Sequence, residues 1–261
     1  MINFLAGAFG VLGGIVAHDL AAQSLADLPL RPFAGTCPQC GNRRGWGHLI
    51  CQQCGRRQGR ELLVIVLAVG FSIAFSNAVG LVWSLVGYLG FLILSLALGI
   101  TDVDSLRIVD RLNLRGTLLV VAALALGSLA DGSGAASLRG LLGGAAYFVG
   151  TNLVFLIVRG RGFGYGDVKL SAQLGVFTAF LSWGTLGWSV FLTALIGGVL
   201  SIAVLLAGVV AKVRAKGTVP GEPGPSIRDA MKVELPYGPS MILGSWVSIA
   251  LAGLGAFPIP T

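Results

Sequence analysis

The sequence predicts an all-α polytopic membrane protein of about eight transmembrane helices with a small cytoplasmic zinc-binding loop. Its composition points this way first, because 55% of its 261 residues are hydrophobic and only 11% are charged. An average soluble domain carries about 25% charged residues. The mean hydropathy of +0.85 excludes a disordered chain and argues against a soluble globular enzyme. The spacing of apolar segments and the placement of basic residues are the other two observations.

Eight apolar segments approach the roughly 20 residues that a membrane-spanning helix needs. They comprise residues 2–18, 62–79, 80–101, 117–131, 137–158, 168–184, 187–211 and 239–257. The first follows Met1 without a basic region or a small-residue cleavage site, so we expect a retained helix and not a signal peptide. The chain then divides into a first transmembrane helix (1–20), a four-cysteine loop (21–60) and a membrane core (61–261).

The basic residues follow this division closely. Eight spans place the connections after the first, third, fifth and seventh segments on one side, and these connections hold 17 of the 18 Lys and Arg residues. Only Arg139 falls on the other side. By the positive-inside rule, the four basic connections are cytoplasmic and the membrane lipid is the main surrounding partner. Nucleic-acid binding is disfavoured, because the charge is spread over four loops and not gathered in one basic patch.

All four cysteines lie in the first predicted cytoplasmic loop. Cys37 and Cys40 form one C-x2-C pair, and Cys51 and Cys54 form a second pair after a ten-residue spacer. Two such pairs have the spacing of a tetrahedral four-thiolate zinc site, and cytoplasmic thiols stay reduced. A site closed by four cysteines is structural, because no coordination position remains open. The alternative is two redox-active or idle pairs.

The few acidic residues are the best candidates for chemistry, because carboxylates near the membrane are costly and usually functional. Asp102, Asp104 and Asp110 cluster where the third segment leaves the membrane, and Asp167 stands at the start of the sixth. The first cluster could instead be a solvated turn whose acids pair with nearby arginines. Asp167 could instead be a charge favoured by a helix N-terminus, with Lys169 nearby.

Both acidic sites lie on the same predicted face of the membrane and can meet inside the bundle. Two carboxylates a few ångströms apart share a proton, so that one activates water while the other protonates a leaving group. Gly164 and Gly166, which precede Asp167 in GFGYGDVKL, allow the backbone to approach a substrate or a facing helix closely.

The sequence resembles the type IV prepilin peptidases, which are membrane aspartyl proteases with a G-x-G-D motif. The stretch 162–170 (GFGYGDVKL) matches their second aspartate motif, and 100–112 (ITDVDSLRIVDRL) is similar to the first, with Val109 in place of the usual proline. The paired C-x2-C motifs, the stretch 60–63 (RELL) and the Pro-aromatic-Gly-Pro entry to the last segment at 235–246 also match.

The resemblance implies that Asp102 and Asp167 form the catalytic pair, with Asp104, Asp110 and Lys169 in supporting positions. It implies type IV prepilins or pseudopilins of a type II secretion system as substrates, cleaved after a glycine at the cytoplasmic face of the bacterial inner membrane. Many members also methylate the new N-terminus with S-adenosylmethionine. No glycine-rich nucleotide loop after a strand supports that cofactor on physical grounds.

Two other classes remain open on the residues alone. A proton-coupled transporter would use membrane aspartates as relays, with carboxylates near mid-helix. A non-catalytic scaffold of a pilus or secretion machine would use the zinc loop for docking. The distance between Asp102 and Asp167 separates these classes, because only the enzyme needs both carboxyls within reach of one water.

Overall fold

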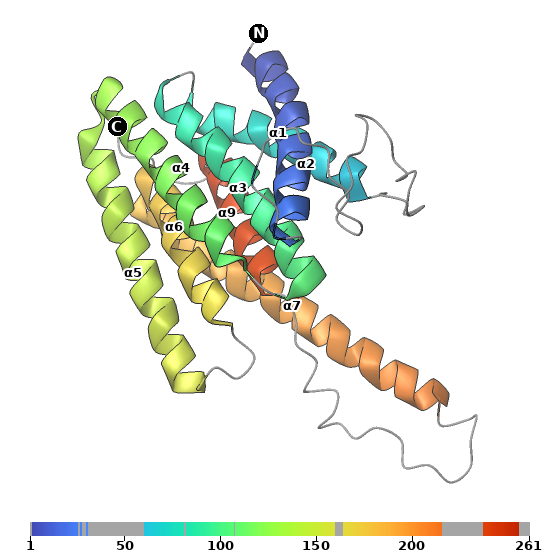
Figure 1. The fold of residues 1–261 in the computed structure, drawn as a ribbon. Helices are drawn as coiled ribbons and strands as arrows, with labels where there is room; N and C mark the ends of the chain where they lie inside the picture. The colour runs from blue at the N-terminus through green and yellow to red at the C-terminus, as the bar shows by residue number, and fades with distance from the viewer. Residues whose placement is uncertain are drawn as a thin grey trace.

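The computed structural model describes residues 2–25, 27, 30, 60–80, 82–106, 108–159, 164–215 and 237–255. Within these ranges all regular structure is α-helical, which confirms the all-α part of the predicted fold class. The helices are α1 (Ile2–Leu25), α2 (Arg60–Val79), α3 (Ser84–Ser105), α4 (Asp110–Ala130), α5 (Gly134–Val158), α6 (Tyr165–Leu181), α7 (Trp183–Ala215) and α9 (Gly238–Gly253) (Figure 1).

The helices fall on the eight predicted apolar segments, but the predicted count of eight spans is not supported. Six helices, α1 to α5 and α7, are long and apolar enough to cross a membrane. The other two, α6 and α9, have 17 and 16 residues. At 1.5 Å per residue they reach about 24–26 Å, which is short of a hydrocarbon core of about 30 Å.

Charged residues explain where the predicted helix ends differ from the observed ones. We predicted that the fourth helix starts at residue 117, whereas α4 already begins at Asp110. Its first two turns carry Asp110, Arg111 and Arg115. A search for apolar segments leaves these two charged turns out, although they belong to the helix. In the same way α7 continues to Ala215, past the predicted end at 211 and through two basic residues.

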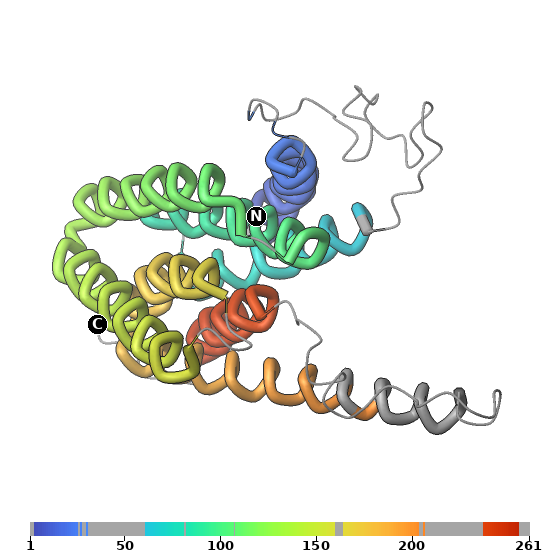
Figure 2. The backbone as a smooth tube through the Cα atoms, turned by 60° about the horizontal axis from the view of Figure 1, so that its bottom comes forward, coloured from blue at the N-terminus to red at the C-terminus, as the bar shows by residue number. Residues whose placement is uncertain are grey.

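Helix α9 contacts α2, α3, α6 and α7 (Figures 1 and 2). Glycine allows its close approach to α7, since a Cβ on Gly244 would lie 2.6 Å from the backbone nitrogen of Thr193. On the other side of the bundle α5 packs along α6. A Cβ on Gly175 would lie 2.7 Å from the carbonyl oxygen of Gly143, so these two backbones nearly touch.

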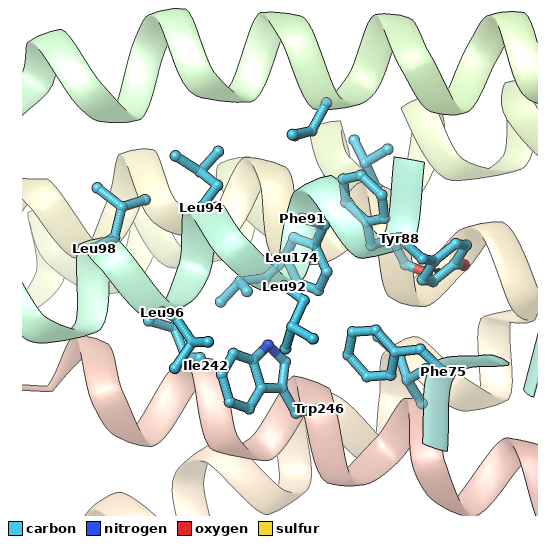
Figure 3. Packing of buried hydrophobic residues seen from close by; sticks show 14 of the residues in the cluster. Phe75, Tyr88, Phe91, Leu92, Leu94, Leu96, Leu98, Leu174, Ile242 and Trp246 are labelled. Carbon is cyan, nitrogen blue, oxygen red and sulfur yellow. Dashed lines mark hydrogen bonds between the residues drawn. The ribbon is translucent and has the colours of Figure 1, made fainter. Parts of the chain in front are cut away.

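Aromatic rings fill the space between α2, α3, α6 and α9. Phe91 of α3 stacks on Phe177 of α6 with ring centroids 4.3 Å apart, and Phe75 of α2 lies against both Phe91 and Trp246. Figure 3 shows Trp246 beside Leu96 and Ile242, between α3 and α9. The buried indole Nε1 of Trp246 donates a hydrogen bond to Ser95 Oγ at 3.1 Å, so its polar atom is satisfied.

Arg139, the one basic residue predicted on the opposite side, has a structural partner there. Its guanidinium donates hydrogen bonds to the carbonyl oxygens of Ala179, Phe180 and Leu181 at the C-terminal end of α6. These carbonyls have no intrahelical donors, and a cation is favoured at a helix C-terminus. Arg139 therefore caps α6 and ties it to α5.

Candidate active site

Asp102 lies in the last turn of α3, where this otherwise apolar helix ends. Its side chain is buried and accepts a hydrogen bond from the backbone N–H of Gly238, with Oδ2 and N 3.1 Å apart. Gly238 is the first residue of α9. Because the N-terminus of a helix carries partial positive charge, this position stabilises a carboxylate at Asp102.

Asp167 lies in the first turn of α6 and is buried as well. Its Oδ2 accepts a hydrogen bond from the N–H of Gly164 at 3.2 Å, and its own N–H donates to the Gly164 carbonyl at 3.1 Å. These two hydrogen bonds cap the N-terminus of α6. A carboxylate at this position satisfies an N-terminal donor and is favoured by the helix dipole.

The segment after α3 approaches α6 through a second glycine. A Cβ on Gly166 would lie 3.0 Å from Cβ of Ile108, which is tighter than ordinary van der Waals contact. Leu106, the first residue after α3, adopts a left-handed conformation with φ 52° and donates its N–H to the carbonyl oxygen of Asp102. The absence of a side chain at Gly166 therefore lets the start of α6 lie close to Ile108, beyond the end of α3 that carries Asp102.

The two aspartates converge on Gly238. A Cβ built on this glycine would lie 2.7 Å from Asp102 Oδ2 and 3.5 Å from Asp167 Oδ1. The two oxygens therefore can be no farther apart than the sum of these two distances, and one bound water can reach both. Three helices thus meet at one point: the C-terminal end of α3 and the N-terminal ends of α6 and α9.

The electrostatics agree with this convergence. Burial, followed by the neighbouring carboxylate of Asp102, raises the pKa of Asp167 to about 7. Burial and the charge of Asp167 also raise the pKa of the half-buried Tyr237 above its usual value, which places its phenol within electrostatic range of the pair. A carboxyl with such a raised pKa keeps its proton up to about pH 7, so one member of the pair can serve as an acid.

The supporting residues from the sequence divide into two groups. Gly164 and Gly166 flank the pair as described, whereas Asp110 and Lys169 bind each other, with Nζ 2.7 Å from Oδ1. This ion pair is solvent-exposed and joins the first turn of α4 to the second turn of α6. Asp104 is exposed and lines a neighbouring cavity instead of facing the pair.

Sequence reasoning did not single out Gly238. It is uncharged and carries no side chain, so no chemical argument selected it. The available signal was the Pro-aromatic-Gly-Pro entry to the last helix, whose glycine places a backbone donor on Asp102.

The predicted zinc ligands lie outside the described residues, so the zinc site stays a prediction. Among the residues that the structure describes, no group of three or more His, Cys, Asp or Glu side chains could hold a metal ion. The predicted use of S-adenosylmethionine likewise stays a prediction.

Comparison with known proteins supports the sequence motifs. Residues 89–202 match the type IV leader peptidase family. This confirms the resemblance to the prepilin peptidases over a segment that runs from α3 into α7 and includes Asp102 and Asp167. The family supports a protein-cleaving activity and a processed protein as substrate. No curated protein and no solved structure matches the chain significantly.

Proposed function

We propose that this protein is a membrane aspartyl endopeptidase that removes the basic leader of type IV prepilins or pseudopilins, after a glycine, at the cytoplasmic face of the bacterial inner membrane. The observation that carries the proposal is the convergence of Asp102 and Asp167 beside the N–H of Gly238. The match to the leader peptidase family supports the reaction class and includes both aspartates.

The mechanism uses one ionised and one protonated carboxyl. The ionised carboxylate takes a proton from a water molecule, whose oxygen attacks the carbonyl carbon of the scissile peptide. The protonated carboxyl donates a hydrogen bond to the carbonyl oxygen as negative charge develops there. When the tetrahedral intermediate collapses, the C–N bond breaks and the leaving nitrogen receives a proton from the pair. The pair returns to its starting protonation state, and no covalent intermediate forms.

The topology supports a cytoplasmic position for this chemistry. The ends of α3, α6 and α9 that meet at the pair adjoin the connections in which the basic residues concentrate.

We further propose that α6 and α9 cross the bundle as short helices enclosed by protein. Almost every residue of α6 after its first turn is buried, including the polar Ser171, Gln173 and Thr178. A helix without lipid contact does not need to match the thickness of the bilayer.

The geometry favours the enzyme over the two other classes. Burying two carboxylates costs free energy, and a non-catalytic scaffold gives no reason for carboxylates from distant helices to converge. A proton relay predicts carboxylates near the middle of spanning helices, whereas both aspartates occupy terminal turns.

Co-expression with candidate prepilins, followed by mass spectrometry of the mature N-terminus, tests the proposal. We expect leader removal by the wild type, and none by Asp102→Asn or Asp167→Asn, although both variants remain in the membrane. Asp104→Asn is the matched control, because it removes an exposed carboxylate two residues from Asp102 and should retain cleavage. Full leader removal by Asp167→Asn would contradict the assignment. The same spectra show whether the new N-terminus is methylated.

For the loop between α1 and α2 we propose a structural zinc site formed by Cys37, Cys40, Cys51 and Cys54. The spacing of the two C-x2-C pairs supports it. Metal analysis of the purified protein should find about one zinc ion per chain, and replacement of the four cysteines by serine should remove it. Zinc that persists in the serine variant would contradict the proposal.

A further inference from the structure

Tyr237, the residue before α9, lies against α7, a helix that holds neither aspartate of the pair. A Cβ built on Gly197 of α7 would lie 2.6 Å from Cε2 of the Tyr237 ring and 3.3 Å from its Cδ2 and Cζ atoms. Real Cβ atoms do not approach other atoms within 3.0 Å, so a side chain at residue 197 would displace the ring. The ring of Tyr237 therefore packs directly on the backbone of α7, and the buried Gly197 makes this possible.

The backbone of Tyr237 is held by the first turn of α9 and by Asp102. Its carbonyl oxygen accepts hydrogen bonds from the N–H groups of Ser240 at 3.0 Å and Met241 at 3.2 Å. The same peptide unit contains the N–H of Gly238, which donates to Asp102 Oδ2 at 3.1 Å. A trans peptide unit is planar, with its C=O and N–H pointing in opposite directions. Rotation of this one unit therefore changes the hydrogen bonds to α9 and to Asp102 together.

The side chain of Tyr237 also lies near the other member of the pair. Its phenol is within electrostatic range of Asp167, as described above. The side chain is half-buried and packs against the apolar core. Tyr237 thus lies between α7 and the carboxyl pair, and its ring connects the position of α7 with the orientation of the peptide unit at Asp102.

We propose that Tyr237 is a positioning residue for the carboxyl pair: its ring, packed on Gly197, orients the peptide unit whose N–H holds Asp102. This inference rests on the proposed peptidase function and adds α7 to the three helices that form the site. The ring makes the contact, and not the hydroxyl, because the atoms close to Gly197 are ring carbons. Without the ring the peptide unit can rotate, and a displacement of about 1 Å at a reacting group costs roughly 100-fold in rate.

A purely structural role is the alternative, because α7 and α9 also pack together elsewhere (Figure 2). One helical turn before Gly197 on α7, the backbone nitrogen of Thr193 would lie 2.6 Å from a Cβ on Gly244. Gly244 is about two turns into α9, away from the pair. Gly197 and Gly244 thus allow two matched perturbations of the same helix pair, one at the site and one beyond it.

The test is a double-mutant cycle, measured as kcat and KM for a prepilin peptide with the purified, reconstituted protein. Tyr237→Leu removes the ring, and Gly197→Ala displaces it. We expect each variant to lower kcat per folded molecule by about tenfold or more, with KM within about threefold of wild type. In the Tyr237→Leu background Gly197→Ala should have little further effect on kcat, because no ring remains to be displaced.

Three further variants separate the ring contact from other effects. Tyr237→Phe keeps the ring and should retain most of the activity that Tyr237→Leu loses. Gly198→Ala adds the same methyl group one residue along α7, where a Cβ has no neighbour within 4 Å, and should leave kcat and KM unchanged. Gly244→Ala should lower the melting temperature, while kcat per folded molecule falls less than in Gly197→Ala.

Two results would overturn the inference while the peptidase function stands. In one, Tyr237→Phe loses as much activity as Tyr237→Leu, which would assign the effect to the hydroxyl near Asp167. In the other, Gly197→Ala and Tyr237→Leu lower kcat additively, or only in proportion to their loss of stability, as a structural contact predicts. Failure of the peptidase function is distinct, because the wild type would then not cleave the peptide.

Hydrogen exchange of the Gly238 amide gives a second measurement, which depends neither on activity nor on the folding of Tyr237→Leu. We expect faster exchange in Gly197→Ala than in Gly198→Ala, because an N–H that loses its bond to Asp102 opens to water more often. Equal protection of this amide in the two alanine variants would overturn the inference.

Discussion

A single methyl group at residue 238 should disable the site while leaving the fold nearly intact. In Gly238→Ala the new Cβ would lie 2.7 Å from Asp102 Oδ2, 3.2 Å from Asp102 Cγ and 3.5 Å from Asp167 Oδ1. Contacts below 3.0 Å are not tolerated, so the carboxyl of Asp102 has to move. It is the end of a side chain, and this movement is cheaper than a shift of a helix.

The expected effect follows from what that movement breaks. The hydrogen bond from the Gly238 N–H to Asp102 is lost or lengthened, and a bond to a charged group contributes about 1.5–3 kcal/mol. A displacement of about 1 Å at a reacting group costs roughly 100-fold in rate. We therefore expect cleavage of a prepilin substrate to fall by about two orders of magnitude, while the protein still folds and inserts.

The control is the same substitution farther along α9. In Gly244→Ala the new Cβ would lie 2.6 Å from the backbone nitrogen of Thr193, away from the pair. Its backbone clash should lower the melting temperature more than Gly238→Ala does, with a smaller loss of cleavage per folded molecule. If Gly238→Ala cleaves within about threefold of wild type, or if the two variants lose activity in proportion to stability, the reasoning is refuted.

Three further predictions concern protonation and helix placement. Because the pKa of Asp167 is raised to about 7, Asp167 loses its proton above that pH, and cleavage should decline there. The native state holds this proton between about pH 4 and 7, where the unfolded chain has lost it, so the free energy of unfolding falls as the pH rises through that range. In thermal unfolding, Asp167→Asn should therefore be more stable than wild type by up to a few kcal/mol at pH 8, but by little at pH 4. Arg139→Met leaves the last carbonyls of α6 without their charged donor and should destabilise the protein by about 2–4 kcal/mol, and an unchanged melting temperature would contradict the capping role. Asp110→Lys should slow cleavage severalfold, because the new lysine repels Lys169. The double variant Asp110→Lys with Lys169→Asp reverses the ion pair and should restore most of the cleavage rate. Equal rates in the single and double variants would show that the ion pair does not position α6.

The sequence predicted the positions of the helices better than their relation to the membrane. Long apolar segments place all eight described helices, because each buries a continuous apolar surface. Hydropathy does not separate a helix in lipid from one enclosed by other helices. It therefore counted α6 and α9 as spans, although both are shorter than a bilayer core requires. Their enclosure depends on tertiary packing, which an apolar window does not contain.

At the site as well, the charged side chains could be predicted from the sequence, whereas contributions that depend on packing could not. Asp102 and Asp167 were predictable, because acidic residues are rare in this chain and carry a recognisable motif. Gly238 was not, since its contribution is a backbone donor and an absent side chain.

The short length of α6 and α9 helps to place the carboxyl pair inside the bundle. A spanning helix of 20 or more residues would carry its N-terminus toward the headgroups, where water and salt screen a carboxylate. With 17 and 16 residues, the two helices place their N-terminal donors within the bundle, against the buried end of α3. There both carboxyls are buried and lie close together, and burial, followed by the charge of Asp102, raises the pKa of Asp167 to about 7. Lengthening α6 at its start, by one helical turn inserted between Gly164 and Asp167, should therefore separate the pair and lower that pKa together with activity.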